Sequence, residues 1–393
     1  MGAGAAGLMA AIFAAGAGRE VVVIERTTDG GRKILISGGG RCNVLPSQLA
    51  PDHFETDSAP HLMRRLLRSW PLVQQRAFFE SELGLPLALE EETGKLFPIS
   101  NRARNVRDAL VSRARELGAV FRFNTSVTGL EPVGDRWMLQ TSHGTVDAAC
   151  VILATGGLSV PTTGSDGGGL TLAAALGHRV HDVYPALTPL LANPSVHAGL
   201  SGVSLDVRLR ARVGKRVVES SGGFLFTHRG YSGPAVLDLS HVAVRNPAAV
   251  IRVQWAALGE DDWEQILADA GGLVLTALAT HVPQRLAAQL MTEVGVPAAR
   301  RAADLRRLER VGLIARLTSY PLPWTGDEGF RKAEVTGGGV ALEEIDSATL
   351  ESRHHKRLFL CGEMLDAFGP IGGHNFAWAW ATGRAAGLGA AEQ

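Results

Sequence analysis

The feature that most constrains this chain is the pattern G-x-G-x-x-G at its start. Three glycines, an apolar helical run, a short apolar strand and an acid follow in order: Gly2, Gly4 and Gly7, then Leu8–Ala15, Val21–Ile24 and Glu25. In this pattern the first glycine makes a tight turn, the second lets the backbone approach a pyrophosphate, and the third lets the helix pack on the sheet. Helix N–H groups then bind the phosphate charge, and Glu25 stands where a carboxylate accepts hydrogen bonds from an adenosine ribose. The pattern predicts a dinucleotide site rather than a plain packing turn.

The strand that normally leads into such a turn is absent, because Met1 directly precedes Gly2. Either the natural chain begins upstream, or the fold tolerates the loss of its central strand. An empty central position would expose the backbone edges of two neighbouring strands and the apolar side of the first helix. We therefore expect an upstream run rich in Val, Ile and Ala.

Composition sets limits on partners and location. The chain of 393 residues is long enough for two or three lobes, and its 39 basic residues balance its 39 acidic ones. A net charge of zero supplies no general field for nucleic acid or an acidic membrane. Three scattered cysteines, Cys42, Cys150 and Cys361, indicate no disulfide framework or zinc site. We expect a cytoplasmic protein with a small-molecule substrate and no membrane or nucleic-acid partner, whose oligomeric state the sequence does not indicate.

A glycine-rich stretch follows the first strand. Residues 30–43 are too rich in glycine for a regular element and end in SGGGRCN. One interpretation is a mobile surface loop. The mixture of glycine with Ser, Arg, Cys and Asn favours backbone and short polar side chains wrapped around a cofactor.

Hydrophobic periodicity divides the rest of the chain. Residues 61–83 read as two helices broken at Pro71, and Val151–Leu153 is a strand that enters a second glycine turn, at the sheet edge where ligands of open α/β folds bind. Beyond Pro185, four runs of period two predict an inserted β lobe: residues 203–212, 216–219, 224–227 and 250–255. Residues 260–317 are predicted to be helical, with amphipathic runs at 263–270, 284–294 and 302–317. Residues 333–340 again combine strand-forming residues with glycines, so the C-terminus is expected to complete the first lobe.

Several of these stretches together resemble one known family. They are SGGGRCN at 37–43, LATGGLSVPTTG at 153–164, THRGYSGP at 227–234, AEVTGGGV at 333–340, CGEMLD at 361–366 and GGHN at 372–375. The chain resembles two-dinucleotide-type flavoproteins, and more closely a bacterial family that includes an FAD-dependent aminoacetone oxidase and a reductase of 3-oxo bile-acid intermediates. The resemblance implies an α/β fold with a Rossmann-like FAD-binding domain, an inserted β-barrel-like lobe and a small helical lobe. The implied boundaries are 1–188 with 331–393, 189–258 with 318–330, and 259–317.

The glycine motif and the resemblance together indicate the cofactor residues. Gly372–Asn375 opens the last helix, whose N–H groups suit the negative charge at N1 and O2 of a reduced flavin. Asp366 resembles an acid at the ribityl or pyrophosphate region, with turn formation or helix capping as the alternative. The chain departs from the family at residues 166–169 and at His374, where tyrosine is commoner. The residues expected at FAD are Gly2, Gly4, Ala6, Gly7, Glu25, Arg26, Lys33, Ser37, Gly38, Gly39, Arg41, Cys42, Asn43, Ala154, Thr155, Gly156, Gly362, Glu363, Asp366, Gly373, His374 and Asn375.

Two residues are candidates for catalysis. His228 could act as an acid or base because imidazole titrates near neutrality, although a structural histidine in a turn is an equal alternative. Cys42 lies where related reductases carry a redox disulfide, but it has no second cysteine nearby, which favours a packed or flavin-adjacent thiol. No histidine has metal-ligand spacing.

Two classes of function remain open. The first is an FAD-dependent oxidoreductase that transfers a hydride between an organic substrate and flavin, with oxygen or NAD(P)H as redox partner. No second glycine fingerprint is present, so NAD(P)H would bind transiently. The second is a flavin-bearing RNA-modification or binding protein. Its basic surface would be residues 300–310, which read more simply as a solvated helix face. We expect the oxidoreductase.

Overall fold

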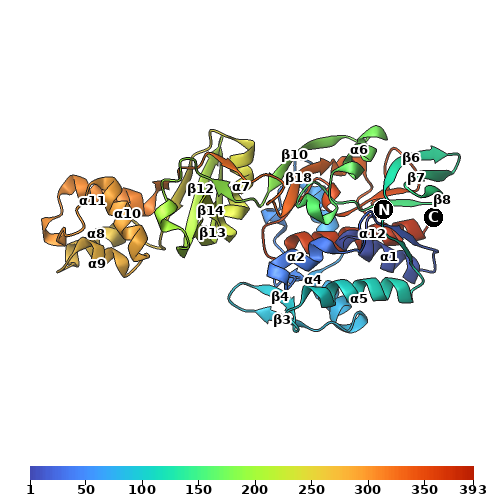
Figure 1. The fold of residues 1–393 in the computed structure, drawn as a ribbon, viewed down its shortest axis with the longest axis horizontal. Helices are drawn as coiled ribbons and strands as arrows, with labels where there is room; N and C mark the ends of the chain where they lie inside the picture. The colour runs from blue at the N-terminus through green and yellow to red at the C-terminus, as the bar shows by residue number, and fades with distance from the viewer. The chain divides into compact units, whose positions relative to one another are not determined.

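The computed structural model describes residues 1–393, and the chain divides into two compact units (Figure 1). Residues Met1–Pro185 and Glu334–Gln393 form the first unit, and Ala186–Ala333 form the second. The first unit is therefore built from both ends of the chain. The three-part division at residues 188, 258, 317 and 330 stays a prediction. The strands and helices of residues 186–333 form one compact unit.

The first unit mixes helices and short strands. Its helices are α1 (Ala5–Gly16), α2 (Arg32–Gly40), η1 (Pro51–His53), α3 (Pro60–Arg68), α4 (Leu72–Ala77), η2 (Phe78–Glu82), α5 (Ala103–Glu116), η3 (Pro161–Thr163), α6 (Gly168–Ala175), η6 (Leu342–Glu344), η7 (Gly362–Met364) and α12 (His374–Ala391). Its strands are β1 (Val22–Ile24), β2 (Leu45–Pro46), β3 (Leu87–Glu90), β4 (Lys95–Pro98), β5 (Val120–Arg122), β6 (Val127–Val133), β7 (Arg136–Thr141), β8 (Gly144–Ala148), β9 (Val151–Leu153), β10 (Val180–Ala186), β18 (Val335–Val340) and β19 (Leu358–Leu360).

The parallel ladders of the first unit are joined by the first residues of the chain. β1 pairs in parallel with β5, and β9 pairs in parallel with β19. Between these ladders, the Gly2 N–H donates to the Ile24 carbonyl at 2.8 Å, and the Ala154 N–H donates to the Met1 carbonyl at 2.9 Å. The amine of Met1 donates to the Ile152 carbonyl at 2.8 Å. The start of the glycine motif is thus bonded to the carboxyl ends of β1 and β9.

Helices α1 and α12 pack side by side, joining the two ends of the chain (Figure 1). Small residues make this close approach possible. A Cβ added to Gly383 would lie 2.4 Å from the Ala6 carbonyl oxygen, and one added to Gly387 would lie 2.4 Å from that of Ala10. Because the neighbouring atoms are backbone, only glycine fits at these two positions without moving a helix.

Smaller sheets surround this core. β6, β7 and β8 form an antiparallel meander, β2, β4 and β3 form a second sheet, and β10 pairs with β18. The predicted break at Pro71 is confirmed, since α3 ends at Arg68 and α4 begins at Leu72. The prediction that residues 30–43 form no regular element is wrong at its beginning. The run 32–36 contains no glycine and forms the first part of α2, before Gly38 and Gly39 take left-handed angles.

The second unit contains an antiparallel sheet and a group of helices. Its elements are β11 (Leu190–Leu191), η4 (Ala198–Leu200), β12 (Ser204–Val213), β13 (Arg216–Phe226), β14 (Gly230–Ser232), α7 (Pro234–Arg245), β15 (Ile251–Gln254), α8 (Glu260–Asp269), α9 (Val274–Ala279), α10 (Gln284–Val294), η5 (Ala302–Asp304), α11 (Arg307–Thr318), β16 (Tyr320–Pro321) and β17 (Gly326–Asp327). The sheet order is β16-β15-β12-β13-β14-β11-β17.

Helix α7 packs on β12 and β13, and one apolar core runs from the sheet into the helices α8 to α11. Two sequence predictions need correction here. The separate strands expected at 216–219 and 224–227 are one strand, because residues 204–213 of β12 pair with β13 without a break. The helical run expected at 302–317 begins with the short η5, so α11 starts only at Arg307.

Candidate cofactor-binding site

A cleft of about 700 Å³ lies in the first unit. Segments from both ends of the chain form its wall. The volume of the cleft is within the range of small-molecule and cofactor sites. Most residues predicted to bind the cofactor line it: Gly2, Gly4, Ala6, Glu25, Arg26, Lys33, Ser37, Gly38, Gly39, Arg41, Asn43, Ala154, Thr155, Gly156, Gly362, Glu363, Gly373 and Asn375. The structure thus brings these residues together, while their contact with FAD stays a prediction.

The glycine turn has the geometry that its sequence predicts. Gly2 has a φ of 94°, a left-handed angle that favours glycine, and its added Cβ would lie 2.4 Å from the Ala154 carbonyl oxygen. A Cβ on Gly7 would lie 2.0 Å from the Gly2 carbonyl oxygen, whereas one on Gly4 would meet nothing within 4 Å. Gly2 and Gly7 therefore serve packing. Gly4 caps α1 at open space beside the cleft, where the first N–H groups of the helix lack intrahelical partners.

Glu25 fixes the glycine turn from the end of β1. Its Oε2 accepts the Ala3 N–H at 2.8 Å, and its Oε1 accepts the Thr27 N–H at 2.8 Å and the Thr27 hydroxyl at 2.7 Å. Only 9% of Glu25 is exposed. The carboxylate thus shapes the turn as well as lining the cleft.

Lys33 and Glu363 connect α2 to η7 across the cleft wall. The Lys33 ammonium donates to Glu363 Oε2 at 2.6 Å and to the Ser159 hydroxyl at 2.7 Å. Glu363 Oε1 accepts the N–H and the hydroxyl of Thr336, each at 3.0 Å, as well as the Ser159 hydroxyl. This network ties together four separate segments of the chain.

The start of α12 forms another part of the wall. Gly373 is its N-cap and provides no side-chain cap, so the first N–H groups of this helix have no intrahelical partners. The Asn375 amide holds the preceding turn, because its Oδ1 accepts the Gly369 N–H and its Nδ2 donates to the Gly369 carbonyl, both at 2.9 Å. The helix start is therefore held in place while its N–H groups stay available to a negative charge.

Two arginines predicted at the cofactor have protein partners. Arg26 pairs with Asp166, which is part of the segment that departs from the family pattern. Burial raises the pKa of Asp166, but the hydrogen bonds from Arg26 and the Gly168 N–H outweigh it and lower the pKa. Arg41 pairs with Glu90 at 3.0 Å and lies over the Phe97 ring at 4.0 Å.

Five candidate residues lie outside the wall of the cleft: Gly7, Cys42, Asp366, His374 and His228. Cys42 is fully buried, and burial raises the pKa of its thiol to about 12, so the thiol is protonated near neutrality. Burial lowers the pKa of His374 to about 4, which makes its imidazole neutral. His228 is exposed in the turn between β13 and β14 of the second unit. The proposed catalytic roles of Cys42 and His228 stay predictions.

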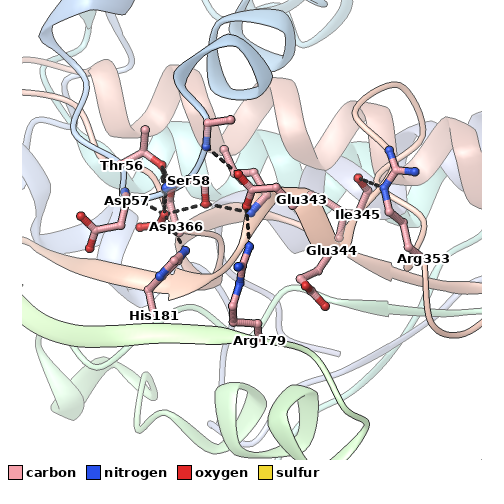
Figure 2. A network of polar contacts seen from close by, with 12 residues as sticks. Thr56, Asp57, Ser58, Arg179, His181, Glu343, Glu344, Ile345, Arg353 and Asp366 are labelled. Carbon is pink, nitrogen blue, oxygen red and sulfur yellow. Dashed lines mark hydrogen bonds and ion pairs between the residues drawn. The ribbon is translucent and has the colours of Figure 1, made fainter.

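The Asp366 carboxylate is hydrogen-bonded to other groups of the protein (Figure 2). Its Oδ2 accepts the Asp57 N–H at 2.9 Å, and the Ser58 N–H and hydroxyl at 2.7 Å each. The Thr56 hydroxyl donates to the same oxygen at 3.0 Å, and His181 lies 3.7 Å from it. Only 1% of Asp366 is exposed. This carboxylate anchors residues 56–58 to the segment after η7, while both its predicted contact with the cofactor and the alternative of turn formation or helix capping stay predictions.

Other residues of the cleft were not predicted from the sequence. Lys95, Phe97, Phe368 and Glu334 line it, together with residues 125–128. Burial raises the pKa of Glu334, although Lys95 and Lys33 act in the opposite direction. Glu334 and Phe368 lie in or beside stretches that resemble the family, so those stretches could have indicated them. Lys95 carries no such signal.

Two buried polar atoms of the wall lack protein partners. Asn43 Oδ1 and Thr155 Oγ1 make no hydrogen bond. Buried polar groups are ordinarily hydrogen-bonded, so unpaired ones in a cleft fit a ligand with polar atoms. Together with the open space at Gly4 and the uncapped helix starts, they fit a dinucleotide that carries ribose, phosphate and ring amide groups.

Comparison with known proteins places the chain in a family. The model of the HI0933-like protein Rossmann domain matches residues 1–389. This chain belongs to that family. It is 33% identical to a ribosomal RNA dihydrouridine synthase of Escherichia coli, over 97% of this chain and 94% of that protein. It is 30% identical to a 3-dehydro-bile acid delta(4,6)-reductase of Clostridium scindens, over 100% and 98% of the two chains.

Among solved structures, this family member is similar to the 3-ketosteroid-delta4-(5alpha)-dehydrogenase of Rhodococcus jostii. The TM-score is 0.52 at 16% identity, and the match covers 100% of this chain and 96% of the other. That likeness supports the Rossmann-type fold. FAD, the cofactor predicted from the sequence, is the one that this family and fold bind. No group of three or more potential metal-ligating side chains occurs, and no helix is long and apolar enough to span a membrane.

Proposed function

We propose that the protein is an FAD-dependent reductase whose substrate has a carbon–carbon double bond conjugated with a carbonyl group. Two relatives support this chemistry. A dihydrouridine synthase is named for saturating the uracil ring, whose double bond is conjugated with a ring carbonyl. A 3-dehydro-bile acid delta(4,6)-reductase is named for double bonds conjugated with the carbonyl at C3. Both reactions add a hydride at one carbon and a proton at its neighbour.

The observation that carries the proposal is the pairing of two helix starts in one cleft. The start of α1, with Glu25 beside it, suits the adenosine and pyrophosphate half of a dinucleotide. The start of α12 at Gly373 suits a ring that gains negative charge. FAD supplies hydride transfer when bound. The chain holds its two halves and stabilises the charge that develops on reduction.

Glu334 is the side chain of the cleft best suited to supply the proton. It makes no hydrogen bond or ion pair, and its surroundings raise its pKa. Its surface is exposed, so a substrate can reach it even though nearby protein desolvates the carboxyl group. A raised pKa keeps a carboxylic acid protonated to higher pH, which suits a proton donor. In this proposal NAD(P)H from the cytoplasm provides the hydride, and Glu334 protonates the neighbouring carbon.

The reductive and oxidative halves of this reaction can be tested separately. FAD-loaded protein is reduced anaerobically with NADPH or NADH and then mixed with a Δ4-3-ketosteroid or with a uridine-rich RNA. We expect one of these to restore the oxidised flavin spectrum and to gain two hydrogens, as measured by mass spectrometry. Protein that is reoxidised only by oxygen would overturn the proposal.

A variant of Glu334 checks the proton donor in the same assay. Glu334→Gln should keep the flavin spectrum and the rate of reduction by NAD(P)H, because the amide preserves the shape of the side chain. Reoxidation by the substrate should slow by about 10²–10⁴-fold, the usual contribution of a general acid. Unchanged reoxidation would remove Glu334 from the reaction.

A further inference from the structure

Strand β12 carries a row of arginines on the exposed face of the sheet in the second unit. Its sequence alternates, with Val207, Leu209 and Ala211 buried against the core. The residues between them, Arg208, Arg210 and Arg212, are exposed. Because alternate side chains of a strand point to one face, these three guanidinium groups share that face at intervals of about 6.8 Å.

Strand pairing widens the row into a patch. Arg252 on β15 lies beside Arg210, and Ser221 on β13 and Gln254 on β15 flank Arg208. We call Arg208, Arg210, Arg212 and Arg252 the arginine patch. Its members come from adjacent strands of one regular ladder, so their spacing is fixed by the backbone.

Three of the four arginines of this patch make no ion pair. Of the acids on the same face, Glu219 pairs with Arg210 at 2.9 Å, and Asp206 lies at the end of the row. Arg208 and Arg212 make no ion pair, and Arg252 donates only to the carbonyl and hydroxyl of Ser319. In a chain with zero net charge this is a local concentration of cations.

We propose that the arginine patch binds the phosphate backbone of a single-stranded RNA that carries the uracil substrate. This inference rests on the proposed reductase function and names its substrate class. Guanidinium groups bind phosphate oxygens in a bidentate manner, and the spacing of alternate strand residues is comparable with that of neighbouring phosphates in an extended strand. The exposed hydroxyl of Ser221 provides a further donor to phosphate or ribose.

Binding of a labelled, uridine-rich single-stranded RNA to the FAD-loaded protein tests this proposal. Fluorescence anisotropy is measured over a series of salt concentrations. Arg208→Ala/Arg212→Ala should weaken binding about tenfold and reduce the slope of log K against log salt by about 1 for each arginine. Arg208→Lys/Arg212→Lys should keep most of the affinity, because a lysine also contacts phosphate.

The matched control removes the same charge elsewhere in the second unit. Arg306→Ala/Arg307→Ala alters the basic run at the start of α11, where the Arg306 side chain is 75% exposed. We expect this control to bind RNA like the unaltered protein. An equal loss in both double variants, or no loss at the arginine patch, would overturn the proposal.

The outcome also separates this proposal from the proposed function. The Arg208→Ala/Arg212→Ala variant should keep its flavin spectrum and its rate of reduction by NAD(P)H, because neither arginine belongs to the cleft. A protein that binds no RNA but is reoxidised by the Δ4-3-ketosteroid would overturn the RNA surface and leave the reductase function standing. A protein that binds RNA at the patch but is reoxidised neither by that RNA nor by the Δ4-3-ketosteroid would overturn the reductase function and leave the RNA surface standing.

Discussion

Asn43 is a residue whose side-chain oxygen has no partner within the protein. It is 8% exposed, its Oδ1 has no hydrogen-bond partner, and it lines the cleft. A Cβ added to Gly373 would lie 2.8 Å from this oxygen, so the start of α12 is close to it. A buried acceptor without a partner costs about 1–3 kcal/mol. The folded protein carries this cost until a donor reaches the oxygen.

Replacing Asn43 should therefore affect affinity and stability in different directions. In Asn43→Ala we expect FAD affinity to fall by about 1–3 kcal/mol, because a polar group of the cofactor loses its acceptor. The Tm of the FAD-free protein should stay the same or rise, because an unpaired buried oxygen has been removed. Titration followed by flavin fluorescence and a thermal melt measure the two quantities. Asn105→Ala, at an exposed position of α5, is the control, and a fall in Tm without loss of affinity would make Asn43 a structural residue only.

At the scale of elements, the contact between α1 and α12 connects packing to the site. Gly383→Ala places a methyl group against the Ala6 backbone, and such overpacking typically costs about 1–3 kcal/mol. Because Ala6 belongs to the first turn of α1, we expect weaker FAD binding as well as a lower Tm. Gly16→Ala, near the end of α1, is the control, since its nearest neighbour would be Leu117 Cδ1 at 3.7 Å. Normal FAD affinity in Gly383→Ala would show that this contact does not position the glycine turn.

The sequence predicts those elements whose signals are local. The glycine turn, α1 and β1 follow from one short motif, and the alternation in β12 follows from its own residues. The sequence does not show that β13 is continuous, because its pairing with β12 decides this. Glycine favours irregular structure at 222 and 223, yet the ladder with β12 holds the strand extended.

The sequence also leaves open which residues of a motif face the cleft. A family motif identifies a stretch near the cofactor, but it does not separate residues that face the cleft from those that support it. Asp366 and Cys42 lie in such stretches and have buried roles. The partners of Asp366 are about 310 positions away in the chain, so no local pattern could have indicated them. Lys95 reaches the cleft only through the hairpin of β3 and β4, whose position is a property of the whole unit.

At the scale of the whole molecule, the two units have separate cores, and the cleft belongs to the first unit. Ligand binding stabilises the structure that contains the site, by about 2.7 kcal/mol at a free ligand concentration of about 100 times Kd. We therefore expect two unfolding transitions in calorimetry, of which only one moves to higher temperature as FAD is added. The second unit should melt at the same temperature throughout. A single transition that moves as a whole would show that the units unfold together.

The joining of α1 and α12 also has a consequence for how the protein is made. The glycine turn leaves the ribosome long before α12, which begins only at His374. A nascent chain therefore carries half of its cofactor site while the residues between these two parts are made. A chain interrupted in the second unit lacks Glu363 and the start of α12, and has nothing with which to close the cleft. We therefore expect uptake of FAD to distinguish chains that contain α12 from truncated ones, which should remain colourless and leave α1 uncovered.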